Sequence, residues 1–106
     1  MSKVYLSHHN IVSALGFTAQ EVVDNIKNEI SGLSLIDDPE VFNTPFYGSI
    51  IPTADLTNAF KPLEKAITYT KLEKMMLLSL HRTITASAIP LNEKVGLIIS
   101  STKGNI

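Results

Sequence analysis

The chain has 106 residues, of which 44% are hydrophobic and 18% charged. This length and balance are those of at most one globular domain, and they exclude a fibrous or an intrinsically disordered chain. Nine Lys and Arg stand against ten Asp and Glu, so the formal net charge is −1, and the basic residues are scattered. We therefore expect neither nucleic acid nor a membrane as a partner. The absence of cysteine excludes disulfides, thiolate metal ligands and a cysteine nucleophile within these residues.

The N-terminal residues are predicted to form a strand rather than a targeting segment. Lys3–Ser7 contains the β-branched and aromatic run Val-Tyr-Leu, which favours a strand, and no secretory signal pattern precedes it. The longest apolar run, Met75–Leu78, is far too short to cross a bilayer. We therefore expect a cytoplasmic protein.

The next element is predicted to be an amphipathic helix. Thr18 and Glu21 have the T-x-x-E spacing of a capping box, in which each side chain accepts a hydrogen bond from a free backbone N–H at the helix start. Apolar residues then recur every four positions over Val22–Ile30, and Gly32 suits the position just after a helix end. The pattern predicts a helix that begins after Thr18 and ends at Gly32.

Between Asp37 and Pro62 the chain holds four of its five prolines. Proline lacks a backbone donor and fixes φ, so long regular elements are not expected here, apart from one short strand over Phe46–Ile51. The segment is also rich in aromatic residues, which a solvated linker would lack. We therefore expect this segment to be an ordered part of the fold and not a flexible linker.

A second capping box, formed by Thr70 and Glu73, predicts a helix that runs to about Ser87, before Pro90. Its middle, Leu72–Leu80, leaves almost no polar face. A helix that is apolar all round is buried on all sides, which is a feature of large cores.

The last predicted strand, Val95–Ile99, is continuously apolar, as is typical of a parallel strand covered on both faces. The polar loop Ser100–Asn105 follows at its carboxyl end, where open α/β sheets bind ligands, and the chain stops at Ile106. A chain of about 100 residues buries only about 60–70% of its surface around one small core. We therefore expect an α/β fold in which residues 1–106 are one partial domain, incomplete as a stand-alone unit.

The order of these elements and several local strings resemble the N-terminal part of the β-ketoacyl-acyl-carrier-protein synthases, which have the thiolase-like fold. The family's V-V-S-P-L-G turn is similar to Ile11–Gly16, and its N-T-x-E-E-x-W-E-N-L helix to Phe17–Ile26. The string G-K-S-G-I is similar to Glu29–Leu33. The family's buried helix resembles Tyr69–Ile84, and its V-G-V-I-I-G-S strand and turn resemble Val95–Ser101. The resemblance spans essentially the whole chain.

The chain departs from the family in ways that indicate a divergent member. The family's T-G-L-G before the first turn is replaced by Ser7–Asn10, so both glycines are lost. The family's P-L-G corresponds to Ala14–Gly16 in this chain, and its later G-S corresponds to Ser100-Ser101.

The resemblance implies decarboxylative Claisen condensation, in which a cysteine carries the acyl group and two histidines help to decarboxylate malonyl-carrier protein. In the family all three residues lie downstream of the matched region. We therefore expect no catalytic, cofactor-binding or metal-binding residue in this chain, and no cofactor. The implied partners are acyl carrier protein, the remainder of the synthase chain, and an identical or related subunit.

Histidines are the first candidates for chemistry in the chain itself. His8 and His9 are adjacent on a predicted strand, so their side chains point to opposite faces, and no third metal ligand stands at a recognisable spacing. A solvent-exposed pair is favoured. His81 lies beside Arg82 without a Ser, Cys or carboxylate partner at motif spacing, which favours a structural histidine over a general base.

Three other features have ordinary structural interpretations. Ser100–Gly104 places its lysine before its glycine, unlike a phosphate-binding P-loop, so a plain loop is expected. The acidic cluster of Asp37, Asp38 and Glu40 is too irregular for a calcium loop and favours a solvated turn. Met75-Met76 is expected to fill the core.

Three hypotheses remain open from the sequence. The first is the N-terminal fragment of a β-ketoacyl synthase-like acyltransferase, inactive alone. The second is a non-catalytic partner subunit of the same fold, and the third is a small independent α/β binding module. The all-round apolar helix argues against the third hypothesis.

Overall fold

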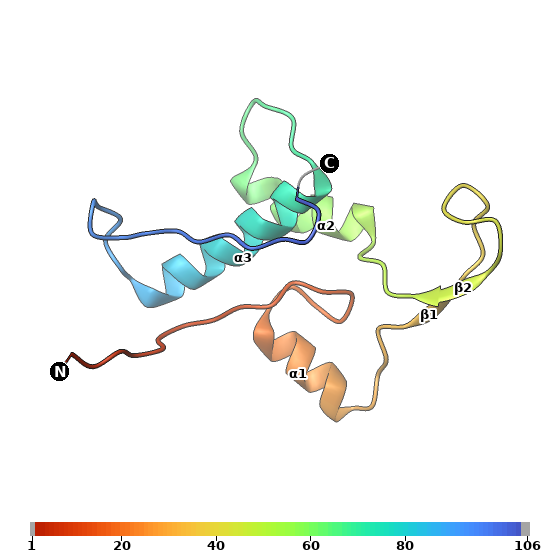
Figure 1. Ribbon diagram of the computed structural model, residues 1–106, viewed down its shortest axis with the longest axis horizontal. Coiled ribbons are helices and arrows are strands. Elements are labelled where there is room, and N and C mark those ends of the chain that lie inside the picture. Colours follow the sequence, from red (N-terminus) through yellow and green to blue (C-terminus); the bar gives the residue numbers. More distant parts are fainter. Residues whose placement is uncertain (1, 105–106) are drawn as a thin grey trace.

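The computed structural model describes residues 2–104, and it has mixed α and β elements, in which the two-stranded sheet lies apart from the longest helix (Figure 1). In chain order the elements are α1 (Ala19–Lys27), β1 (Ser34–Ile36), β2 (Phe46–Gly48), α2 (Thr53–Phe60), the 3-10 turn η1 (Lys61–Leu63) and α3 (Lys71–Ser87). No helix within the described residues is long and apolar enough to cross a membrane.

Helix α1 begins as the sequence predicts and ends earlier. The Thr18 Oγ1 accepts a hydrogen bond from the Glu21 backbone N–H at 3.2 Å, while the Glu21 Oε2 accepts one from the N–H of Phe17 at 3.1 Å. The helix ends at Lys27, so the predicted end at Gly32 is wrong. Glu29 adopts a left-handed φ of 59° instead, and the backbone N–H of Ile30 donates to Asn25 O, which is the hydrogen-bond pattern of a Schellman end.

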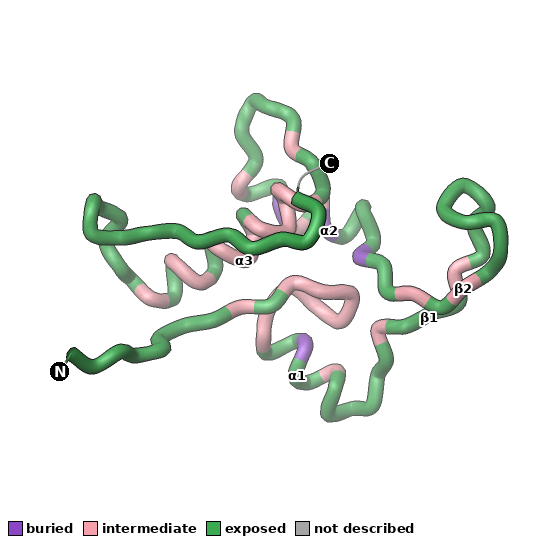
Figure 2. The backbone as a smooth tube through the Cα atoms, viewed as in Figure 1, coloured by how far each residue is buried: buried purple, intermediate pink, exposed green. Residues whose placement is uncertain are grey.

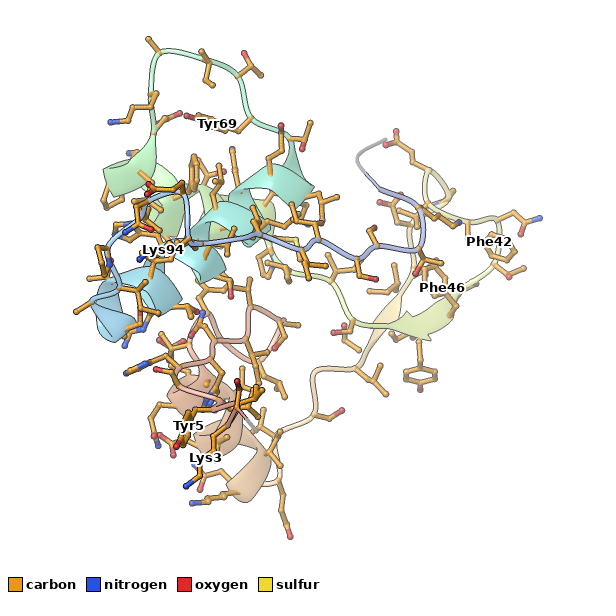
Figure 3. The ribbon with its side chains drawn as sticks, turned by 60° about the vertical axis from the view of Figure 1, so that its left-hand side comes forward. Lys3, Tyr5, Phe42, Phe46, Tyr69 and Lys94 are labelled. Atoms are coloured by element: carbon orange, nitrogen blue, oxygen red, sulfur yellow. The ribbon has the colours of Figure 1, made fainter. Side chains whose placement is uncertain are left out.

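Strands β1 and β2 form an antiparallel pair in which Leu35 lies opposite Tyr47. Strand β1 was not expected, and β2 is shorter than the predicted strand Phe46–Ile51. Within the loop that joins β1 and β2, Phe42 packs edge to face on Phe46, with ring centroids 6.2 Å apart (Figure 3).

Helix α2 was not expected, because the proline-rich segment was predicted to hold no long regular element apart from one short strand. It begins after Pro52, whose side chain cannot cap it, so no polar cap marks its start in the sequence. Its residues Leu56 and Phe60 are the most deeply buried in the described chain, each about 1% exposed, and α2 packs on α3. The Phe60 ring meets Tyr69 edge to face at 4.8 Å. The small core is therefore centred where α2 crosses α3.

Helix α3 confirms the predicted start and end. Both bonds of the capping box are present: the Thr70 Oγ1 accepts from the Glu73 N–H at 3.2 Å, and the Thr70 N–H donates to the Glu73 Oε1 at 2.8 Å. The helix ends at Ser87, followed by Ala88 in the left-handed region. Its expected burial on all sides is wrong, because α3 has no fully buried residue and Leu77 is 41% exposed.

The two strands predicted at the ends of the chain are absent. Residues 3–7 and 95–99 run extended but form no ladder, because each lacks a neighbouring strand with which to exchange backbone hydrogen bonds. Figure 2 shows both segments exposed along their length. The expected parallel sheet covered on both faces is therefore not formed, and the only sheet in the described part of the chain is the β1–β2 pair.

The chain is more open than a folded domain of its size. Its radius of gyration is 16.6 Å, whereas about 13 Å is usual for a compact domain of this length. Its accessible surface is 8765 Å², against about 5,800 Å² for a typical monomer of this mass. The excess surface is largely apolar, since many large aliphatic side chains are exposed.

The helix end at Ala88 provides a matched pair of variants. Ala88 has a φ of 56°, which an alanine adopts only with strain, whereas Ala86 lies within α3. Ala88→Gly is expected to raise the free energy of unfolding by about 0.5–1 kcal/mol, and Ala86→Gly to lower it by up to about 1 kcal/mol. Chemical denaturation followed by circular dichroism measures both values. Equal effects of the two variants would contradict the left-handed helix end.

Candidate functional site: an apolar trough along α3

The most developed concave surface lies along α3, between the two extended ends of the chain. Figure 1 shows that the chain turns back after α3, so that the second of these segments, residues 95–100, runs opposite to the helix, while the N-terminal segment forms the other border. The two segments border one hollow with the α3 residues between them.

We call this surface the trough, and it has two adjoining parts that share Leu80, Thr83 and Leu97. The first part has a volume of about 430 Å³ and an almost wholly apolar wall. Tyr5 and Leu6 line it from the N-terminal segment. The second part, about 550 Å³, is lined by both polar and apolar residues.

Asn10 fixes the N-terminal segment to the rest of the chain at the inner end of the trough. Its Nδ2 donates to the backbone O of Phe17 at 3.0 Å and to the Oγ of Ser79 on α3 at 3.2 Å. Its Oδ1 accepts from the N–H of Ala19 at 3.2 Å. One side chain thus joins the N-terminal segment, the start of α1 and the middle of α3. No sequence motif marks this role, because the hydrogen-bond partners of Asn10 are distant from it along the chain.

The described lining of the trough holds one serine–histidine pair, Ser7 and His8, but no carboxylate that could orient the imidazole. His8 is the one titratable side chain other than Tyr5 that lines its first part, and it is exposed and in hydrogen-bond contact with the neighbouring Ser7 hydroxyl. His9 is also exposed. The arrangement favours an apolar ligand or polypeptide over a reacting small molecule.

His81 lies in a separate hollow of about 510 Å³, between the start of α1, the end of α2 and α3. Arg82 and Glu21 share this hollow, and all three side chains are exposed. The Glu21 carboxylate accepts from the Phe17 N–H, as described above. The structure places no hydroxyl or thiol nucleophile in hydrogen bond with His81 among the described residues, which leaves it without a triad geometry.

The remaining sequence candidates lie in turns. The Ser101 Oγ accepts from the Gly104 N–H at 2.9 Å, which closes the loop after residue 99, while Asn105 and Ile106 lie outside the described residues. Asp38 Oδ1 accepts from the Glu40 N–H at 3.0 Å, which confirms a turn at the acidic cluster. No group of three or more potential metal ligands occurs within residues 2–104.

Comparison of the chain with protein-family models, with curated protein sequences and with solved structures found no match in any of the three.

The three bonds of Asn10 predict a measurable contribution to stability. Asn10→Ala removes all three and leaves the partner groups unsatisfied, so the free energy of unfolding should fall by about 2 kcal/mol. The control is Asn43→Ala in the exposed β1–β2 loop, which is expected to change it by less than about 0.5 kcal/mol. Urea denaturation measures both, and similar values for the two variants would contradict the role of Asn10.

Proposed function

We propose that this chain is the N-terminal part of a β-ketoacyl-acyl-carrier-protein synthase-like acyltransferase of the thiolase-like superfamily. The observation that carries the proposal is the arrangement around α3, where two extended segments far apart in the sequence border one apolar hollow together with the helix. Helix α3 and residues 95–101 are also among the regions whose sequence resembles the family, in the same order along the chain, whereas the N-terminal segment departs from it at Ser7–Asn10.

The exposed surface supports a part of a larger assembly over an independent binding module. In a stand-alone module the side chains of a strand such as Leu97 and Ile98 are covered, whereas here they are 63% and 94% exposed. Completion of the fold by further strands would cover them. The partners that follow from the proposal are the remainder of the synthase chain, a second identical or related subunit, and acyl carrier protein, in the cytoplasm.

On this proposal residues 2–104 have a structural role. They supply α3 and two strand edges, while the condensing chemistry depends on a cysteine and two histidines that this chain does not provide. The chain alone should therefore not release CO₂ from malonyl-carrier protein above the rate of a protein-free control. A complete condensing enzyme assayed in parallel shows that the substrate is competent, and decarboxylation by the chain alone would contradict the proposal.

The coding sequence around this chain gives the sharper test. An open frame beyond codon 106 that encodes a cysteine on a strand-to-helix turn, followed by two distant histidines, is the expected result. An open frame with the same pattern of elements but other residues at those positions would instead identify a non-catalytic partner subunit. A stop codon, together with a purified chain that is monomeric and unfolds cooperatively, would overturn both.

A further inference from the structure

Residues 95–99 form an unpaired strand edge with no charged side chain. The segment reads Val-Gly-Leu-Ile-Ile, and its four large side chains are all exposed. Within the described chain the backbone of residues 96–99 makes no hydrogen bond, and Val95 donates only to the turn residue Asn92. Apolar strands with free backbone donors and acceptors are templates for pairing with another strand.

We propose that this edge pairs with the same edge of a second copy, antiparallel about a two-fold axis centred on Ile98. A two-fold axis perpendicular to the sheet leaves each side chain on its own face. Two residues that lie opposite each other must therefore have numbers whose sum is even, and the axis must pass beside one residue of each copy. Centring on Ile98 sets Leu97 opposite Ile99 of the other copy, and Gly96 opposite its Ser100. In this register Leu97, Ile98 and Ile99 meet apolar residues, whereas Val95 lies opposite Ser101.

Charge also fits this register and this occupant. Glu93 precedes the segment and Lys103 follows it. Both residues lie in the turns that flank the extended segment. With Ile98 at the centre, the turn that holds Glu93 in each copy lies toward the turn that holds Lys103 in the other, so opposite charges face each other at both ends of the pair. The net charge of −1 opposes association only weakly.

Over the whole chain, the exposed area exceeds that of a compact monomer by more than a standard dimer interface requires. The excess over a compact monomer is about 3,000 Å², whereas a standard interface buries about 800 Å² on each partner. Tyr5 and Leu6, which line the trough together with residues 95–97, are exposed as well, as is the neighbouring Val4. The inference concerns this 106-residue chain and does not depend on the proposed enzyme family.

The absence of cysteine makes the register directly testable. Ile98→Cys places one thiol at the proposed axis, and paired residues of antiparallel strands have Cα atoms about 4.5–5.5 Å apart, within the range of a disulfide. Val41→Cys, at an exposed position in the β1–β2 loop, is the matched control. At low micromolar concentration under mild oxidation, Ile98→Cys is expected to form a disulfide-linked dimer much faster than Val41→Cys. Equal rates would overturn the register.

Light scattering with size-exclusion chromatography tests the association itself. The unmodified chain is expected to be a dimer. Ile98→Asp should weaken it by more than about a hundredfold, because two carboxylates would meet at the axis. Val41→Asp should leave it unchanged. Ile98 is almost fully exposed in the single chain, so circular dichroism should show that Ile98→Asp keeps its helices. A monomer, a disordered aggregate, or a dimer that Ile98→Asp does not weaken would overturn the proposal, whatever the coding sequence shows about the enzyme family.

Discussion

The packing of α2 against α3 is the contact on which the rest of the structure depends. Leu56 and Phe60 are buried there, and the Tyr69 ring closes on Phe60 just before α3 begins. Only Val22 and Ile51 are comparably buried elsewhere in the described chain. Helix α3 is consequently held on one side, while its other side faces the trough and carries side chains whose cover is incomplete. The open shape and the unpaired segments follow from this small core.

The elements with local signals were predictable from sequence. Both helix starts followed from a Thr with a Glu three residues later, because a cap is formed by atoms close together in the chain. The end of α1 did not follow from the sequence. Gly32 was predicted to end the helix, but Glu29 does so in the left-handed region, where backbone hydrogen bonds close the helix despite the cost of that conformation. Helix α2 had no such signal, since it starts after a proline.

The strands show where local reasoning stops. The sequence of residues 95–99 favours a strand, and the chain there is extended. A strand also needs a neighbouring strand with which to exchange backbone hydrogen bonds, and that neighbour cannot be read from local sequence. The same holds for residues 3–7. The trough could not be foreseen either, because Tyr5, Leu80 and Leu97 come together only through the path of the whole chain. The predicted absence of a catalytic site stays a prediction for the parent protein, since it follows from the family resemblance.

The proposed synthase relationship and the proposed pairing of two copies have one physical origin. Both treat the extended segments beside α3 as strands that lack neighbours. Hydrogen exchange of the backbone amides, measured at a dilution where the chain is monomeric, tests this most directly. The account predicts protection in α2 and α3 and almost none at residues 4–9 and 96–99. Protection of residues 96–99 as strong as that of α3 in the monomer would contradict it.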